Sequence, residues 1–185
     1  MKVTRSGIPG LVIFEPTPFR DHRGFFTRTL DVAVLADAGI DPASFKQENQ
    51  SRSRLGGIRG LHGRVTDGGE AKLARCARGT VLDVIVDARP DSPAFGRVET
   101  FVLDDVDHRQ VYAPGGCLHG YQVLSDEADF CYRTDVFYGP GEVAVNPLDA
   151  ELAVPWREPH GELSERDLAS PGWRDFARTV LGVEL

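Results

Sequence analysis

The sequence is poor in the residues that cross-link small secreted domains. Its 185 residues include three cysteines, Cys76, Cys117 and Cys131, an odd number with no C-x-x-C spacing. Cysteines in this pattern are typical of free thiols in a reducing compartment, so we expect a cytoplasmic protein. Nothing beside Cys117 in the sequence favours a lowered thiol pKa, and we interpret this residue as packed rather than nucleophilic.

Long hydrophobic runs and an excess of positive charge are also missing. The apolar run near the N-terminus, within MKVTRSGIPGLVIFEP, is broken by Gly and Pro and is too short to span a membrane. It lacks a small-residue cleavage site, so we expect no targeting segment. The net charge of -7 and pI near 5.2 argue against nucleic acid or anionic membrane as partners, because neither attracts an acidic body.

The remaining sequence features predict one β-rich domain without repeats, and the length of 185 residues is consistent with one domain. Short β-branched or aromatic runs, separated by Gly, Pro or Asp turns, predict strands. These runs cover residues 10–16, 71–79, 80–89, 97–103, 109–114, 119–125 and 129–138. The spacing predicts an all-β sandwich or barrel, with a jelly roll as the natural candidate.

Two stretches predict peripheral helices. Residues 31–39 stop at Gly39, and residues 171–182 begin with Pro171 and carry apolar positions at helical spacing. Within the strand at 80–89, alternation places Asp83 on the same face as Val81 and Ile85. A carboxylate on an apolar face needs a partner, so we expect Asp83 to have one.

The run RGLHGRVTDGGEAKLARC, residues 59–76, raises the question of what His62 does. Its imidazole titrates near neutral pH, Arg59 can bind an anion, and Lys72 supplies a fixed positive charge. A lone histidine is more often a structural group than a base or a ligand. The surrounding sequence favours a functional role for His62.

Eight segments, in order and at compatible spacing, resemble the dTDP-4-dehydrorhamnose 3,5-epimerase family over nearly the whole chain. They are DHRGFF (21–26), FKQENQS (45–51), GGIRGLHG (56–63), AKLARCARGTVLDVIVDAR (71–89), SPAFG (92–96), YAPGGCLHGYQVLSD (112–126), YRTDVFYGP (132–140) and LSERD (163–167). The resemblance implies a cupin jelly roll, a homodimer, and an activity without cofactor on a dTDP-4-keto-6-deoxyhexose in deoxysugar biosynthesis.

We expect a single domain over residues 1–185, with a cupin core at roughly 45–150. The resemblance also implies catalytic roles for four residues of this domain. His62 is the expected base, and Asp167, from the C-terminal segment, orients its imidazole. Lys72 is expected to hold the negative charge that develops on the ketone oxygen. Tyr132 resembles the acid that returns a proton on the opposite face, because inversion needs delivery from the side away from the base.

Further positions match substrate contacts of the family. The expected substrate-binding residues are Arg23, Gln47, Asn49, Arg59, His119, Tyr138 and Arg166. Tyr138 matches a tyrosine that stacks on the thymine, and Arg166 replaces a common lysine while keeping the phosphate partner. Asp83 is assigned a supporting role near His62.

The sequence departs from the family pattern at three places that bear on substrate binding. LHGR stands where the family commonly has LHYQ, so an aromatic after His62 is lost and Arg64 is gained. Arg28, in FFTR, stands where a family glutamate helps to bind the nucleotide, which reverses the charge of that contact. The segment after Tyr138 is shorter than usual, and its acidic contact is assigned to Glu142. Whether C3, C5 or both centres are inverted stays open.

Two other functions are consistent with parts of the sequence. PGGCLH, residues 114–119, also resembles half of a metal cupin signature, which would suit an oxygenase. The H-x-H pair of the first half is missing, because Gly63 and Arg64 follow His62, and Lys72 adds a repelling charge, so we expect no metal. A non-catalytic nucleotide-sugar binder on the same scaffold would need no base and acid.

Overall fold

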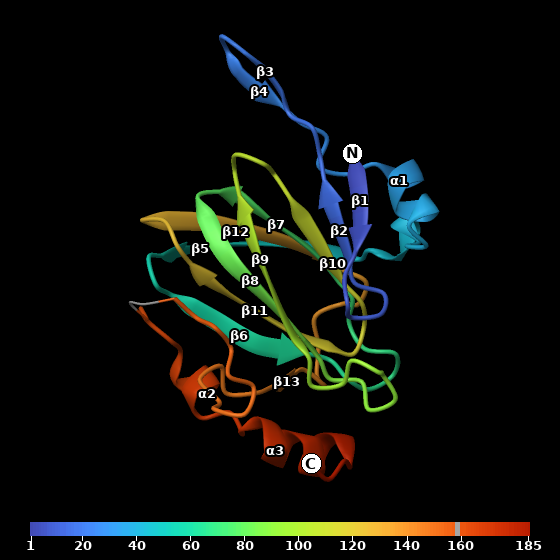
Figure 1. The fold of residues 1–185 in the computed structure, drawn as a ribbon, viewed down its shortest axis with the longest axis vertical. Coiled ribbons are helices and arrows are strands. Elements are labelled where there is room, and N and C mark those ends of the chain that lie inside the picture. Colours follow the sequence, from blue (N-terminus) through green and yellow to red (C-terminus); the bar gives the residue numbers. More distant parts are fainter. Residues whose placement is uncertain (158–159) are drawn as a thin grey trace.

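The computed structural model describes residues 1–157 and 160–185 and consists mainly of two facing antiparallel sheets (Figure 1). The first sheet has the order β1-β2-β10-β7-β12-β5 and the second β13-β6-β11-β8-β9. Their strands are β1 (Lys2–Arg5), β2 (Val12–Glu15), β5 (Gln47–Arg54), β6 (Ile58–Gly63), β7 (Lys72–Arg78), β8 (Thr80–Asp87), β9 (Val98–Asp104), β10 (Gln110–Ala113), β11 (Cys117–Val123), β12 (Glu127–Thr134) and β13 (Val143–Ala144). The prediction of an all-β jelly roll is confirmed. Strands β1 and β2 of the first sheet lie before residue 45, where the expected cupin core begins.

Alternation along the central strands separates the interior from the outer layers. Val81 and Ile85 of β8 pack between the sheets, whereas Leu82 and Val84 pack outward in one cluster with Trp173. This is the two-face pattern expected of residues 80–89. Because both faces of β8 are covered, polar side chains on the inner face must find partners inside the sandwich.

Both predicted helices form, and they cover outer faces of the sandwich. Helix α1 (Val32–Asp37) begins at Asp31, whose carboxylate accepts hydrogen bonds from the first-turn amides, and it packs Leu35 in a cluster with Phe14 of β2. Helix α3 (Trp173–Phe176) continues as a π-helical turn over Ala177–Leu181. A third, unpredicted helix, α2 (Glu165–Leu168), lies in the C-terminal segment, and a 3-10 turn covers Pro42–Ser44.

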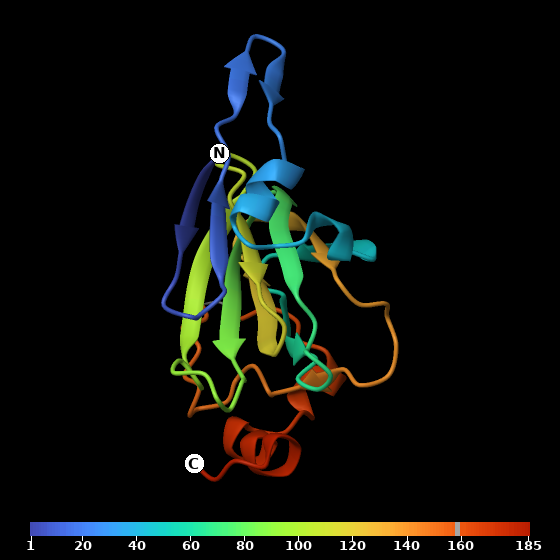
Figure 2. The same cartoon turned by 90° about the vertical axis from the view of Figure 1, so that its right-hand side faces the viewer.

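The sequence analysis did not predict several strands that lack an alternation of apolar and polar residues. Strand β5 reads QENQSRSR and alternates half-buried with exposed side chains, all of them polar. A short hairpin of β3 (Phe19–Asp21) and β4 (Gly24–Phe26) projects from the sandwich beyond the N-terminus (Figures 1 and 2). Polar edge strands and a protruding hairpin carry little core burial, so periodicity does not signal them.

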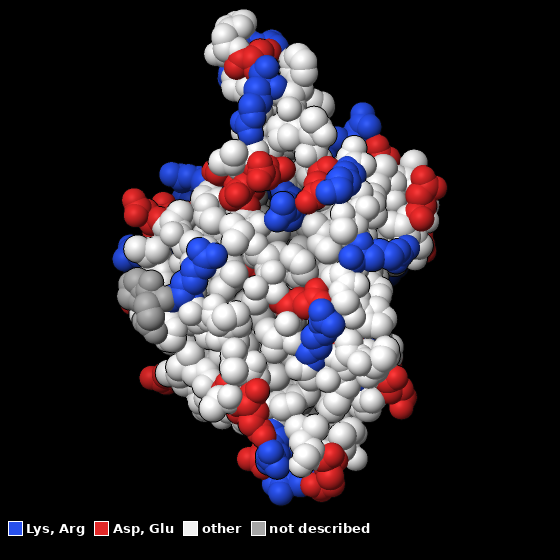
Figure 3. Space-filling view, viewed as in Figure 1, with Lys and Arg blue, Asp and Glu red and all other residues white. Residues whose placement is uncertain are grey.

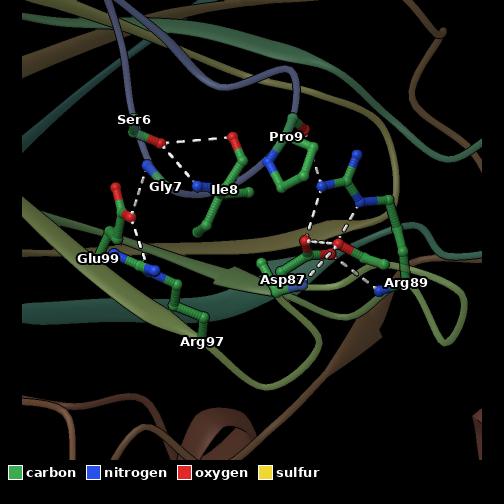
Figure 4. A network of polar contacts seen from close by, with 10 residues as sticks. Ser6, Gly7, Ile8, Pro9, Asp87, Arg89, Arg97 and Glu99 are labelled. Atoms are coloured by element: carbon green, nitrogen blue, oxygen red, sulfur yellow. Dashed lines mark hydrogen bonds and ion pairs between the residues drawn. The ribbon is translucent and has the colours of Figure 1, made fainter.

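A polar network ties the turn before β2 to the second sheet (Figure 4). The Gly7 amide donates to Glu99 Oε1 at 3.0 Å, and Arg89 Nη2 donates to the Pro9 carbonyl at 2.9 Å. Arg89 also pairs with the buried Asp87 at 2.7 Å. Burial alone would raise the pKa of Asp87, but hydrogen bonds from Arg89 and Ser92 outweigh it and lower the pKa.

Charged side chains are dispersed over the face drawn in Figure 3. Among the described residues on this face, acidic and basic groups interleave rather than gather into a basic stripe of the kind that follows a phosphate backbone. In the described part of the chain, no helix has both the length and the apolar character needed to cross a membrane.

Candidate active site

A pocket of about 880 Å³ opens between the inner faces of the two sheets. Its wall combines strands from both sheets with the segment that carries α2. Its lining includes Asn49, Ser51, Lys72 and Tyr132 from the first sheet, Arg59, His62, His119 and Tyr121 from the second, and Glu142, Arg166 and Asp167 from later segments. All four residues predicted to be catalytic and five of those predicted to bind substrate therefore line one cavity.

Strand register explains why these residues meet. On the second sheet, His62 of β6 lies directly opposite His119 of β11. On the first sheet, Thr134 of β12 lies opposite Lys72 of β7, and Tyr132, two residues away, shares the face of Thr134. Each sheet therefore presents its own group of polar side chains inward, and the sandwich places the two groups across the pocket.

The predicted dyad is formed: His62 Nε2 lies 2.6 Å from Asp167 Oδ1. Asp167 sits in α2, whose first turn is capped by the Ser164 hydroxyl accepting from the Asp167 amide. The carboxylate is 4% exposed, and the imidazole is 25% exposed toward the pocket. A proton on Nε2 satisfies the carboxylate and leaves the Nδ1 lone pair as the proton acceptor.

A second histidine–aspartate pair lies deeper in the sandwich. His119 Nε2 is 2.6 Å from Asp83 Oδ1, and both side chains are buried. The expected partner of Asp83 therefore exists and is His119, which lies opposite His62 on the neighbouring strand. The pairing follows from register, because Asp83 lies opposite Tyr121 on β11, and His119 is two residues from Tyr121 on the same face.

A hydroxyl network at the pocket wall was not anticipated from the sequence. The Tyr121 hydroxyl lies 2.8 Å from Ser51 Oγ, and Arg59 Nε donates to Ser53 Oγ at 2.9 Å. The Tyr121 ring stacks on Phe130 with 4.2 Å between centroids. Period two was the available signal: Tyr121 follows His119 by two residues, and Ser51 follows Asn49 by two.

Charge at the mouth of the pocket is partly neutralised. Arg166 Nη2 lies 2.5 Å from Glu142 Oε2, which raises the pKa of the guanidinium. Inside, burial raises the pKa of Tyr132, and the negative charges of Glu70 and Glu142 raise it further. Tyr132 is therefore held in its protonated form, as a proton donor must be.

Four predicted substrate contacts lie outside the wall of this pocket. Arg23 is at the tip of the β3–β4 hairpin, paired with Asp21, and Arg28 pairs with Asp31 at 2.8 Å beside α1. Gln47 Oε1 accepts from the Tyr138 amide, and the Tyr138 side chain is 87% exposed. Within one copy of the chain, these side chains are not gathered around His62.

The LHGR departure has a structural cause and a structural consequence. A Cβ on Gly63 would lie 2.5 Å from the Cys117 carbonyl oxygen, so an aromatic residue there would require the backbone to move. The next side chain, Arg64, donates from Nη1 to the Pro140 carbonyl at 2.6 Å and from Nη2 to the Gly139 carbonyl at 3.3 Å. Arg64 thus fastens the loop that follows Tyr138 to β6.

We expect Arg64→Gln to loosen that loop without unfolding the protein. Each of the two guanidinium hydrogen bonds is worth about 1 kcal/mol, so their joint loss should accelerate amide exchange over residues 137–142 by up to roughly thirtyfold. Hydrogen–deuterium exchange with mass spectrometry measures this. Arg97→Gln, which removes the guanidinium that pairs with Glu99, is the matched control. Equal exchange in both variants would contradict the anchoring role.

The structure also bears on the reactivity of Cys117 and on the metal-dependent alternative. Cys117 is buried, and burial raises the pKa of its thiol to about 12, as expected of a packed residue rather than a nucleophile. Among residues 1–157 and 160–185, no three His, Cys, Asp or Glu side chains come together in a group that could hold a metal ion.

Comparison with known proteins gives a consistent picture. The family model of dTDP-4-dehydrorhamnose 3,5-epimerase matches residues 5–175. A dTDP-4-dehydrorhamnose 3,5-epimerase of Pseudomonas aeruginosa is 39% identical, covering 95% of this chain and 97% of its own length. A dTDP-4-dehydrorhamnose 3-epimerase of Streptomyces niveus is 40% identical, with coverage of 90% and 81%.

Solved structures agree. The 4-keto-6-deoxy sugar epimerase NovW of Streptomyces spheroides superposes with a TM-score of 0.93 at 37% identity, covering 100% of this chain and 92% of its own. ChmJ, a 3'-monoepimerase of Streptomyces bikiniensis solved with dTDP-quinovose, gives a TM-score of 0.89 at 34% identity, with coverage of 96% and 89%. The chain belongs to the dTDP-4-dehydrorhamnose 3,5-epimerase family.

Proposed function

We propose that this protein epimerises a dTDP-linked 4-keto-6-deoxyhexose at C3, at C5 or at both, without a cofactor. The observation that carries the proposal is the His62–Asp167 dyad facing Lys72 and Tyr132 in one pocket. A proton beside a ketone is weakly acidic, so its removal needs a placed base and a group that stabilises the enolate. The pocket holds both, as well as a candidate acid on the opposing sheet.

The residues divide the reaction between them. His62 Nδ1 takes the proton from the carbon next to the C4 ketone, and Asp167 stabilises the resulting imidazolium through Nε2. The C–H electrons move onto the ketone oxygen, where the Lys72 ammonium compensates the charge. Tyr132 then delivers its hydroxyl proton to the opposite face of the carbon as the enolate electrons return to that carbon and the ketone re-forms. Tyr132 regains a proton from solvent, and His62 releases to solvent the proton that it took.

The nucleotide end of the substrate is assigned to the pocket mouth. Arg59 and Arg166 supply cationic groups for a diphosphate, and Asn49 and His119 supply hydrogen-bonding groups on the two inner faces. Relatives named for dTDP sugars support the choice of nucleotide.

Solvent exchange tests the proposed function. The protein is incubated with a dTDP-4-keto-6-deoxyhexose in deuterated water, and NMR and mass spectrometry follow deuterium at C3 and C5. We expect exchange and inversion at one or both carbons, and unchanged activity after exhaustive chelation. Binding without exchange would favour the non-catalytic alternative, and activity lost with a stoichiometric metal would favour the oxygenase. Exchange with another nucleotide's sugar alone would preserve the mechanism and contradict the dTDP assignment.

We further propose a homodimer in which the β3–β4 hairpin contacts the second copy. The hairpin projects from the sandwich (Figure 2), and its Phe19 and Phe26 side chains are 68% and 71% exposed. Exposed aromatic side chains of this kind are typical of association surfaces. The arrangement would also reconcile the expected substrate role of Arg23 with its distance from the pocket of its own chain.

Mixing two inactive variants tests the dimer and the hairpin together. If Arg23 serves the pocket of the other copy, a hybrid of Arg23→Ala and His62→Asn contains one complete pocket. Random reassortment should then restore up to about a quarter of wild-type activity. Light scattering confirms the dimer, and each variant incubated alone is the control. A monomer, or a mixture that stays inactive while hybrids form, would overturn the assignment.

A further inference from the structure

The Lys72 ammonium has a carboxylate partner that the proposed mechanism does not use. Lys72 begins β7 on the inner face, and its side chain is 9% exposed. Its Nζ lies 3.3 Å from Glu70 Oε2, two residues earlier in the chain. An ammonium taken out of water requires a counter-charge, and Glu70 supplies one within the same segment.

Tyr132 borders the same ammonium on the adjacent strand. Lys72 Nζ lies 5.8 Å from the centre of the Tyr132 ring, within the range of a cation–π contact. The pairing of β12 with β7 enforces this neighbourhood, because Thr134 is opposite Lys72 and Tyr132 is its diagonal neighbour on the same face. The ammonium is thus held between a carboxylate and the candidate acid.

We propose that Glu70 is a positioning residue of this site, which holds the Lys72 ammonium beside Tyr132 before substrate binds. The inference rests on the proposed roles of Lys72 and Tyr132. Glu70 does not line the pocket wall, so it acts through Lys72 rather than by touching the sugar. When negative charge develops on the ketone oxygen, the ammonium is already in place and no reorganisation is needed.

The charges around Tyr132 give Glu70 a second effect of the same sign. Burial is the first cause that raises the pKa of Tyr132, followed by the charges of Glu70 and Glu142 and by Tyr121, while Arg59 lowers it. Removing the Glu70 carboxylate therefore makes Tyr132 easier to ionise. The same change leaves the Lys72 ammonium without the carboxylate that holds it beside Tyr132.

The effect on Tyr132 acts on the alkaline side of the pH–rate profile. Catalysis needs Tyr132 in its protonated form, so activity is lost as the pH rises through the range where Tyr132 deprotonates. Glu70→Gln keeps the shape of the side chain and removes its charge. We expect the alkaline limb of kcat/KM to move about half to one pH unit lower, with a smaller change on the acid limb.

The experiment compares Glu70→Gln with two further variants. Glu70→Asp keeps the charge and should restore most of the alkaline limb. Glu151→Gln alters net charge equally at an exposed ion pair with Arg174 and should leave the profile unchanged. Thermal melts confirm that each variant folds. Profiles of Glu70→Gln and wild type that superimpose, or an equal shift in Glu151→Gln, would overturn the inference.

A readout without substrate separates this inference from the proposed function. Spectroscopic titration of tyrosinate absorbance, with Tyr132→Phe identifying the Tyr132 signal, should show that signal ionising at lower pH in Glu70→Gln. If no dTDP sugar is turned over but this shift is present, the contact of Glu70 with the Lys72–Tyr132 pair stands and the reaction assignment fails. If the Tyr132 signal ionises at the same pH in Glu70→Gln as in the wild type, the inferred effect of Glu70 on the Lys72–Tyr132 pair is contradicted.

Discussion

His62→Asn is expected to lower kcat by roughly 10²- to 10⁴-fold, because the substitution removes the proton acceptor of the pocket. Asparagine nearly keeps the side-chain volume and can still hydrogen-bond Asp167, so the fold should survive. Turnover of a dTDP-4-keto-6-deoxyhexose, followed together with deuterium entry at C3 and C5, measures the effect. Both inversion and exchange should fall, since each begins with the same proton abstraction.

Asp167→Asn should act in the same direction as His62→Asn, because it removes the charge that supports the imidazolium. Wild-type turnover by His62→Asn or by Asp167→Asn would remove the dyad from the mechanism.

Tyr132→Phe is expected to uncouple inversion from exchange at C5. The substitution removes only the hydroxyl, so His62 can still abstract a proton and return a solvent-derived one to the same face. Losing a proton-transfer group costs roughly 10²- to 10⁴-fold, and here that loss should fall on inversion at C5. Exchange at C3 should be affected less. NMR of the sugar in deuterated water separates the two outcomes.

Tyr112→Phe serves as the control, because Tyr112 is a half-buried tyrosine of β10 that does not line the pocket. An equal loss of exchange and inversion in Tyr132→Phe would mean that the hydroxyl holds the substrate or the enolate. The separate role of Tyr132 as an acid would then be withdrawn, while His62 would remain the base.

The sequence by itself was sufficient for the fold class and the family. Short β-branched runs such as 80–89, separated by Gly, Pro and Asp turns, indicate an all-β domain, and the ordered segments around His62 and Asp167 matched one family. It also indicated that Asp83 needed a partner, since a carboxylate among apolar side chains is costly unless it is paired. These features are local, and neighbouring residues along the chain encode them.

Only the tertiary structure decided which partners those residues take. Asp83 pairs with His119 because the register of β8 against β11 brings them together, and no local pattern specifies register between strands. The polar strand β5 joins the sheet through its pairing with β12, although its sequence has no apolar face. Glu70 lies 3.3 Å from the Lys72 ammonium, and the burial of both side chains in the folded chain makes this neighbouring charge a counter-ion. Contacts across strands and the dielectric of the interior arise only when the two sheets close, and the sequence lists the participants without that geometry.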